Sequence, residues 1–307
     1  MEKRKDIYDL FWYFAYERQE IFINKLNNKK VLTNDVILQT YKFCNAYRVN
    51  DRVSQYLLSN VIYNKEYSSS DMIFRIILFK IFNKESTWEL LEKNFIDIKL
   101  DTFDFKKYCD VLNNSNIPIY NDAYISCASK VFNYNKKHEN HLYLVYKMFF
   151  LDKFDLKLLE CKTMKEGFEL LKSYPLIGDF MAYQLITDIN YSDVLNFSES
   201  EFTIPGPGAI RGINKVFINC DNYVDAIKYM YLNQDKEFKR LNYDFKYLKN
   251  RKLQYIDIQN LFCELDKYCR VYDPSLKSNR KKIKKKYVSK NNNIKYIYPK
   301  KWNCDII

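Results

Sequence analysis

The sequence predicts an all-α protein organised as a two-lobed helical bundle. Apolar side chains recur every three or four residues along most of the 307 positions, which is the period of an amphipathic helix. Only five glycines occur, so the turns depend on Asn, Asp and Ser, as in helices joined by short polar loops. A hydrophobic content of 47% excludes a disordered chain, and no apolar run reaches the length of a membrane span.

The helices are expected at intervals along the whole chain. The first covers residues 7–26, and Thr33-Asn34-Asp35 offers the start of a second that runs to Ser59. Ser70-Asp71 can cap a helix from Met72 to Phe82. Further helices are predicted at 86–94, 104–113, 121–134, 140–151, 155–172, 179–189, 208–217, 222–232 and 256–270. A short strand is expected at 294–298.

The positive charge is concentrated near the C-terminus. The net charge is +12, yet the segment from Lys277 to Lys301 contains eleven Lys or Arg and no acidic residue, so the rest is almost neutral. We therefore expect a helical domain at 1–275 and a basic, flexible tail at 276–307, with Trp302 as a short anchor. Such a tail favours a polyanionic partner, DNA ahead of an anionic membrane, and the alternative is a solubilising tail.

Cysteine and histidine spacing argues against a metal centre. The eight cysteines include no Cys-x-x-Cys pair, and the only histidines, His138 and His141, read as a polar helix start. The cysteines are expected to be reduced core residues, and the amphipathic N-terminus indicates no secretory signal. We expect a cytoplasmic protein with neither a metal nor another cofactor.

All five glycines lie between Gly167 and Gly212, and the first candidate motif is there. Residues 173–183 read Ser-Tyr-Pro-Leu-Ile-Gly-Asp-Phe-Met-Ala-Tyr and separate two amphipathic stretches. They resemble the helix-hairpin-helix of base-excision DNA glycosylases, usually Pro-Gly-(Ile or Val)-Gly. Such a turn presents backbone N–H groups to a DNA phosphate. Leu176 replaces the first glycine, and a plain turn between helices is the alternative.

A second loop lies about 25 residues further on, where the glycosylases begin a helix with Val-Asp-x-x-Val-x-Arg. Here residues 202–212 read Phe-Thr-Ile-Pro-Gly-Pro-Gly-Ala-Ile-Arg-Gly. Aligning Arg211 with the motif arginine puts Gly206 where those enzymes carry the catalytic aspartate. Phe180 occupies the place of the lysine found in bifunctional members, which disfavours Schiff-base chemistry at that position.

Several segments together resemble a narrower family. They are Glu17-Arg18-Gln19 and residues 35–38, 42–53, 74–83, 176–191, 205–212 and 257–268. In combination they are similar to the α-glutamyl/putrescinyl thymine pyrophosphorylase family, which overlaps the helical domain linked to hydroxymethyluracil DNA kinases. The resemblance spans about residues 10–275. It implies a divergent, glycosylase-like helical fold and action on a modified base in DNA, either by removal or by elaboration.

The polar candidates for DNA and substrate binding lie on several segments. Asn45, Arg48, Asp51 and Arg52 can be placed on one helix, where a surface ion-pair ladder is the alternative. The resemblance favours a pocket wall in which Arg faces phosphate and Asn or Asp faces the base. The other binding candidates are Gly178, Gly206, Gly208, Arg211 and Lys267.

Three aspartates compete for a catalytic role. Asp188 ends the helix after the hairpin, Asp51 follows the arginine cluster, and Asp266 lies on an apolar helix near the C-terminus. A glycosylase needs a carboxylate to stabilise an oxocarbenium-like sugar or to activate water. For Asp188 the alternative is a local cap, and Glu264 and Lys267 on the last helix can be an ordinary solvated pair.

The leading hypothesis is a monofunctional DNA glycosylase that flips a modified pyrimidine out of duplex DNA and hydrolyses its glycosidic bond, with anti-phage defence as one use. The second is a transferase that joins an amine or amino acid to activated hydroxymethyluracil in DNA. It requires a pocket for the nucleophile and a base for its proton. The third is a DNA-binding module without catalysis.

Overall fold

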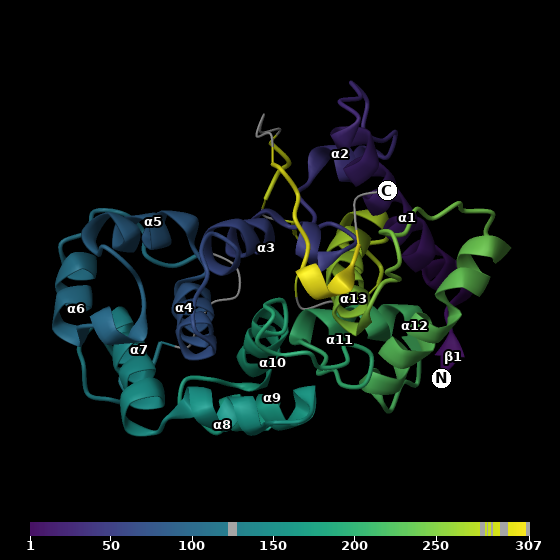
Figure 1. Cartoon of the computed structure of the whole chain (residues 1–307). Coiled ribbons are helices and arrows are strands. Elements are labelled where there is room, and N and C mark those ends of the chain that lie inside the picture. Colours follow the sequence, from purple (N-terminus) through teal and green to yellow (C-terminus); the bar gives the residue numbers. More distant parts are fainter. Residues whose placement is uncertain (122–127, 277–279, 281, 284, 289–293, 305–307) are drawn as a thin grey trace. The chain divides into compact units, whose positions relative to one another are not determined.

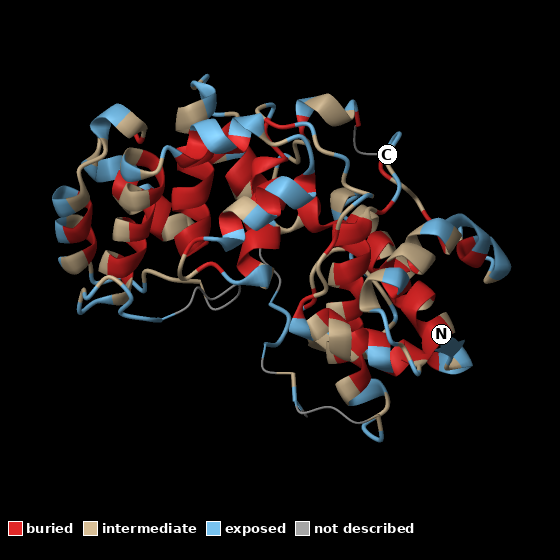
Figure 2. Ribbon diagram, turned by 90° about the horizontal axis from the view of Figure 1, so that it is seen from below, coloured by how far each residue is buried: buried red, intermediate tan, exposed pale blue. Residues whose placement is uncertain are grey.

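The computed structural model describes residues 1–121, 128–276, 280, 282–283, 285–288 and 294–304 (Figure 1). Helices make up nearly all regular structure in these ranges, which confirms the all-α prediction. The sheet found there pairs β1 (Glu2–Lys3) antiparallel with β2 (Phe217–Ile218). Among the described residues, no helix is long and apolar enough to cross a membrane. The chain divides into two compact units, and Figure 2 shows that the buried residues of each line the packed faces of its helices.

The first unit contains residues 1–51, 203–296 and 302–307. Its helical elements are α1 (Lys5–Leu26), α2 (Val36–Thr40), the 3-10 helix η1 (Arg48–Asn50), α11 (Pro207–Val216), α12 (Tyr223–Arg240) and α13 (Tyr255–Tyr272). The core is aromatic: Phe11 of α1 lies against Trp12 and against Phe262 of α13, with ring centroids 5.1 and 4.6 Å apart. Burial of such rings is a large hydrophobic contribution to the stability of this unit.

Two glycines let α11 lie directly against α13. A Cβ atom on Gly208 would overlap the Cys263 Sγ atom, and one on Gly212 would overlap the backbone carbonyl of Phe262. Neither glycine has a positive φ, so the absence of a side chain, rather than backbone freedom, is what these positions need. The close approach brings polar residues of α11 within reach of α13.

The second unit contains residues 52–202 and 297–301. Its elements are α3 (Arg52–Tyr56), the π-helix η2 (Leu57–Ile62), α4 (Ser69–Phe82), α5 (Glu85–Asn94), η3 (Leu100–Thr102), α6 (Phe105–Asn113), α7 (Lys137–Tyr146), the π-helix η4 (Lys147–Leu151), α8 (Phe154–Glu160), α9 (Met164–Lys172) and α10 (Asp179–Ile189). The last element that the structure describes is the 3-10 helix η5 (Lys300–Trp302). Helix α4 is the apolar centre of the unit: all residues from Met72 to Phe82 are buried.

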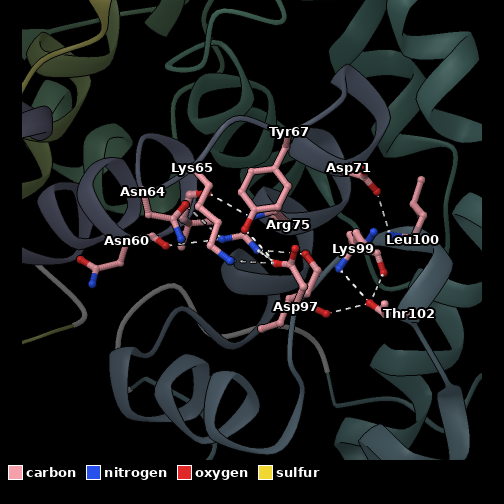
Figure 3. Close-up of polar contacts among 12 residues, drawn as sticks. Asn60, Asn64, Lys65, Tyr67, Asp71, Arg75, Asp97, Lys99, Leu100 and Thr102 are labelled. Atoms are coloured by element: carbon pink, nitrogen blue, oxygen red, sulfur yellow. Dashed lines mark hydrogen bonds and ion pairs between the residues drawn. The ribbon is translucent and has the colours of Figure 1, made fainter.

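The Arg75 side chain, a cation within this apolar helix, contacts backbone carbonyls, an aromatic ring and a carboxylate. Its guanidinium donates to the carbonyls of Val61 and Ile98 at 3.2 and 2.9 Å and lies 3.9 Å from the Tyr67 ring centroid (Figure 3). An ion pair with Asp97 at 3.9 Å completes the set. Because a buried charge is tolerated only when it is paired and hydrogen-bonded, this network explains how an arginine occupies the core.

Helices α9 and α10 pack against each other across the connection 173–178, where the hairpin motif was expected. Leu176 has a φ of 67°, the left-handed conformation that the missing glycine would adopt at little cost. Gly178 is exposed and caps α10, and a Cβ there would meet no atom within 4 Å. The assignment as a helix-hairpin-helix stays a prediction.

Several expected elements differ in the structure. The single helix expected at 155–172 is two helices, because the Thr163 hydroxyl accepts the N–H of Glu166 and starts α9 anew. Of the helix expected at 121–134, residues 122–127 lie outside the described residues and 128–134 are irregular. There the Asn140 side chain binds the Phe132 amide and competes with helical bonding. The helix expected from residue 35 to 59 stops at Thr40, since Tyr41 is extended.

The basic tail contacts the body of the protein where the structure describes it. In the first unit, the Tyr287 amide donates to Thr40 and the Lys42 amide to Lys285, at 2.9 and 3.0 Å. In the second unit, Ile297 exchanges hydrogen bonds with the Gln55 side chain, so residues 294–298 are not the expected strand. The Trp302 ring lies 3.3 Å from the guanidinium of Arg251, and its role as an anchor of the tail stays a prediction.

Candidate active site

The segment 43–51 of the first unit is extended and then turns through η1, because side chains from α1 and α13 bind its backbone. Arg18 of α1 donates from Nε to the Cys44 carbonyl at 2.7 Å and from Nη2 to the Phe43 carbonyl at 3.3 Å. These bonds replace the helical hydrogen bonds that the sequence pattern predicted. Burial lowers the pKa of the Arg18 guanidinium, and the neighbouring carboxylates oppose that change.

Two carboxylates accept the next two backbone amides of this segment. The Cys44 N–H donates to Glu264 Oε2 and the Asn45 N–H donates to Asp51 Oδ1, each at 2.8 Å. Lys267, one turn after Glu264 on α13, donates to the same Oε2 atom at 2.6 Å. Two successive amides therefore hold the acid that follows η1 and an acid from α13 beside one short stretch of backbone.

Asp51 is the acid whose proton affinity is most clearly altered. Burial raises its pKa to about 6, the Asn45 amide opposes the rise, and the charge of Glu264 adds to it. Arg48 and Arg18 lower the pKa and keep it from rising further. Since Asp51 is only partly buried and gains or loses its proton close to neutral pH, it is suited to transfer protons during a reaction.

Cys44 is not suited to act as a nucleophile. Its thiol pKa lies well above the ordinary value because of burial and the charges of Asp51 and Glu264. A thiol needs to lose its proton to attack an electrophile. The chemistry of this site therefore rests on its carboxylates and cations.

Asp266 lies on the other face of α13 and has a different environment. Its side chain is fully buried and binds Arg211, Lys215 and Arg270 at 3.0, 2.9 and 2.6 Å. Burial would raise the pKa of Asp266, but the hydrogen bonds from Arg270 and Lys215 outweigh it and hold the pKa below its usual range. This aspartate stays an anion that binds α11 to α13.

Asp188 belongs to the second unit and is part of its interior. The Lys80 ammonium lies 2.7 Å from Asp188 Oδ2, with side-chain exposures of 4% and 1%. The pair joins α4 to α10 and is withdrawn from solvent. Of the three candidate catalytic aspartates, Asp51 alone combines partial exposure with a pKa near neutrality.

The structure places only some of the predicted binding residues close to one another. Asn45 accepts from Arg18 at 3.4 Å and lies beside Asp51. Arg48 is buried, and its amide donates to Asp257 at 2.8 Å. Arg52 starts α3 in the second unit and pairs with Glu85 at 3.3 Å, so the expected common helix face of these residues was wrong.

The other predicted binding residues lie in several places. Gly178 is exposed before α10 in the second unit, whereas Gly206 is buried and caps α11 in the first. Gly208 is explained by the packing of α11 on α13. Arg211 is partly exposed beside Asp266, and Lys267 is partly exposed beside Glu264 with its ammonium 4.5 Å from the Phe43 ring centroid. Contact of any of them with DNA stays a prediction.

Two residues of the candidate site, Arg18 and Glu264, were not assigned to any site from the sequence. Arg18 occupies a core-facing position of α1, four residues after Phe14 and three before Ile21, and a cation at such a position signals a buried partner. Glu264 was expected to be a solvated partner of Lys267. Its bond to the Cys44 amide joins positions 220 residues apart, and the spacing of residues within a helix cannot predict such a contact.

The described residues include no group of three or more His, Cys, Asp or Glu arranged to hold a metal ion. The His138 ring binds the Asn113 side chain at 2.8 Å, and the His141 ring binds the Tyr120 hydroxyl at 2.7 Å. Seven cysteines in the described ranges are free thiols. The candidate site is thus assembled from acidic and basic side chains.

Comparison with known proteins identifies relatives of the chain. The model of a family described as "5-hmdU DNA kinase, helical domain" matches residues 5–278. A protein named 5-hmdU DNA kinase from Bacillus phage SP10 is 24% identical over 327 alignment positions, which cover 97% of this chain and 51% of the relative. The chain therefore spans about half the length of that relative. No solved structure matches.

These matches overturn the leading hypothesis of the sequence analysis. The relatives are named for a kinase, which is a transferase, so the assignment as a DNA glycosylase and hydrolase was wrong. The physical reason is visible in the motif positions. Gly206 and Phe180 stand where a glycosylase carries its aspartate and lysine. The resemblance to the hairpin therefore came from the pattern of two helices and a turn, and it did not include the residues that perform glycosylase chemistry.

Proposed function

Because the chain belongs to the family of 5-hmdU DNA kinase helical domains, we propose that it is a transferase acting on hydroxymethyluracil in DNA. The reaction joins an amine to the activated 5-hydroxymethyl group of the base. Family membership supports the substrate, and the carboxylate arrangement at segment 43–51 supports group transfer. Its DNA partner, the modified base and the enzymatic activity are all parts of this proposal.

The observation that carries the proposal is the placement of Asp51, a partly exposed carboxylate that accepts the Asn45 amide one residue away from the amide that Glu264 accepts. An amine attacks only when its nitrogen lone pair is available, and it must lose a proton as the new bond forms. A carboxylate whose pKa is raised to about 6 accepts such a proton more readily than an ordinary aspartate. Asp188 and Asp266 are each engaged in buried ion pairs and are not proposed as the base.

The reaction can be written with its atoms balanced. The amine nitrogen attacks the exocyclic methylene carbon, and a C–N bond forms. The C–O bond to a phosphate-type leaving group breaks, and that group departs with the bonding electrons. One proton of the amine passes to the Asp51 carboxylate. Lys267, partly exposed next to Glu264, stabilises negative charge on the departing oxygen.

The remaining residues of the site hold this geometry. Arg18 fixes the carbonyls on either side of the Cys44 amide, and Glu264 fixes that amide itself. The Asn45 amide donates to Asp51. The orientation of this carboxylate, the proposed general base, therefore depends on the same short segment. Arg18 and Glu264 therefore act as positioning residues.

The relative's name favours a second candidate, phosphoryl transfer to the hydroxymethyl oxygen. In that case Asp51 would accept the hydroxyl proton. The five glycines of this sequence form no Gly-x-x-x-x-Gly-Lys run, the loop that cradles nucleotide phosphates in many kinases. We therefore place amine transfer first.

The test uses DNA that contains hydroxymethyluracil or its phosphate-activated form, supplied with an amine or with ATP. After digestion to nucleosides, mass spectrometry should show a product whose mass corresponds to the amine joined to the methylene with loss of the leaving group. Asp51→Asn should reduce the rate at least about 100-fold, the usual range for loss of a general base. Circular dichroism verifies that the variant is folded.

A matched control is Asp9→Asn, an acid of α1 that pairs with Arg240 and not with the candidate site. Its rate should equal that of the wild type. A nucleoside that gains a phosphoryl group from ATP would replace amine transfer by the second candidate. Unchanged nucleosides under all conditions, with DNA still bound, would reduce the chain to a binding module.

A further inference from the structure

A cavity of about 390 Å³ lies at the C-terminal end of α12 and the residues that follow, in the first unit. Aromatic rings line it: the buried Phe238 and Phe245 and the partly exposed Tyr243 and Tyr247. The volume is within the range of small-ligand pockets, about 300–1,000 Å³. Neither the site around Asp51 nor the proposed reaction uses this cavity.

The rings are held in fixed positions before any ligand arrives. Phe238 and Phe245 are stacked with centroids 4.3 Å apart and an interplanar angle of 17°. Tyr243 stacks on Tyr16 of α1 at 4.7 Å and 11°. A fixed aromatic ring loses little conformational entropy when a flat ligand stacks on it.

Two acids and one lysine line the cavity, and the two acids have cationic partners that leave Lys239 to bind an anionic group of a ligand. The carboxylate of Asp235 accepts the Tyr247 hydroxyl at 2.8 Å and pairs with Lys252, and Asp244 pairs with Lys246. Both acids of the cavity therefore already have cationic partners, so an organic cation gains little there. Lys239 lines the cavity and is exposed at the surface.

Hydrogen-bonding capacity completes the arrangement. Asn242 lines the cavity, is exposed, and has a φ of 58°, which ends α12 and turns the chain toward Tyr243. Its amide offers one donor group and one acceptor group, the pair that matches the edge of a nucleobase. Stacking surfaces, an amide and a lysine are the kinds of groups that bind a single strand of nucleic acid.

We propose that this cavity binds an unstacked base of a single DNA strand, with the adjoining phosphate on Lys239. The inference rests on the proposed function in one respect, that the chain handles DNA. It adds a second contact point for the strand, separate from the reacting base. Phe238 and Phe245 supply the apolar wall, and Tyr243 supplies the stacking face.

The test measures binding of a fluorescently labelled 15-nucleotide oligothymidylate by anisotropy. Tyr243→Ala should weaken binding about tenfold, whereas Tyr243→Phe should retain it, because stacking on an aromatic ring depends on the ring face. Lys239→Ala should lower the slope of log affinity against log salt by about 0.7, the value for one phosphate contact on a single strand. Circular dichroism verifies folding.

The matched control is Lys236→Ala, an exposed lysine of the same helix that does not line the cavity. Its affinity and salt slope should equal those of the wild type. The inference would be overturned if Tyr243→Ala and Lys239→Ala both bound the oligonucleotide as tightly as the wild type. It would also be overturned if tetramethylammonium displaced the strand and sodium at the same concentration did not.

The two proposals fail separately. If oligothymidylate binding depends on Tyr243 and Lys239 while hydroxymethyluracil nucleosides stay unchanged, the cavity assignment stands and the transferase proposal falls. If the nucleoside product forms while the cavity variants bind the strand as the wild type does, the reverse holds.

Discussion

The charged side chains of the two units have different environments. In the second unit, Lys80 and Asp188 form an ion pair that is almost fully withdrawn from solvent, and Arg75 is bound by carbonyls, a carboxylate and aromatic rings. In the first unit, burial raises the pKa of Asp51 to about 6 and the charge of Glu264 adds to the rise, while the side chain stays partly exposed. The first arrangement fixes charge, whereas the second leaves a proton exchangeable.

This difference separates structural from chemical carboxylates among residues that look alike in sequence. A buried, matched pair is costly to break, because removing one partner leaves the other charge buried without compensation. An acid held by a single backbone amide beside another acid has a proton affinity that suits catalysis. The predictions below test that separation, beginning with the largest expected change in stability.

Breaking the buried pair should have the largest effect. Lys80→Met leaves the Asp188 carboxylate buried without this partner, and the free energy of unfolding should fall by about 3–5 kcal/mol. Urea unfolding followed by circular dichroism measures the change. The double variant Lys80→Met/Asp188→Leu should recover most of the loss, because no charge is then left behind. A loss below 1 kcal/mol in the single variant would show that the pair is not structural.

Adding a methyl group at the contact between α11 and α13 should come next. Gly212→Ala places a Cβ against the Phe262 carbonyl, which cannot move without its helix. The expected loss is about 3 kcal/mol, the upper end for overpacking. Differential scanning calorimetry measures it. Wild-type stability would mean that α11 and α13 do not approach as closely as described.

Much of the helical fold could be predicted from apolar spacing, and the predicted range 179–189 coincides with α10. Local pattern failed where distant side chains bind the backbone. Residues 41–47 look helical in sequence, but Arg18 and Glu264 hold their amides and carbonyls in an extended form. Asp51 could be nominated from sequence, whereas its pKa depends on Glu264, more than 200 positions away, and on burial that no local pattern encodes.

Removing the ionisable group of Asp51 should stabilise the protein near neutral pH. The pKa of Asp51 is higher in the folded chain than its ordinary value of 3.8, so its stabilising contribution is complete below pH 4 and is lost as pH rises through 6. Asp51→Asn cannot ionise and still accepts the Asn45 amide. At pH 7 the variant should be more stable by about 2 kcal/mol.

Urea unfolding at pH 4 and pH 7 measures this effect, and the advantage of the Asn variant should vanish at pH 4. Asp9→Asn, run in parallel, should show no such pH-dependent gain. A variant that is less stable than the wild type at pH 7 would contradict the raised proton affinity.

The smallest change in stability is expected at Gly178. A Cβ there meets no atom, and its φ of −86° suits any residue, so Gly178→Ala should change the free energy of unfolding by less than about 0.5 kcal/mol. Binding of duplex DNA should nevertheless weaken, because the methyl group would keep a phosphate from the exposed backbone. Unchanged DNA binding would remove this glycine from the predicted binding residues.

The most direct test is the pH dependence of nucleoside product formation by the wild type, Asp51→Asn and Asp188→Asn, each verified as folded. The account predicts a wild-type rate that rises through pH 6 to a plateau, the same midpoint in Asp188→Asn, and a rate at least about 100-fold lower without that midpoint in Asp51→Asn. Retention of the wild-type rate and midpoint by Asp51→Asn would contradict the central claim.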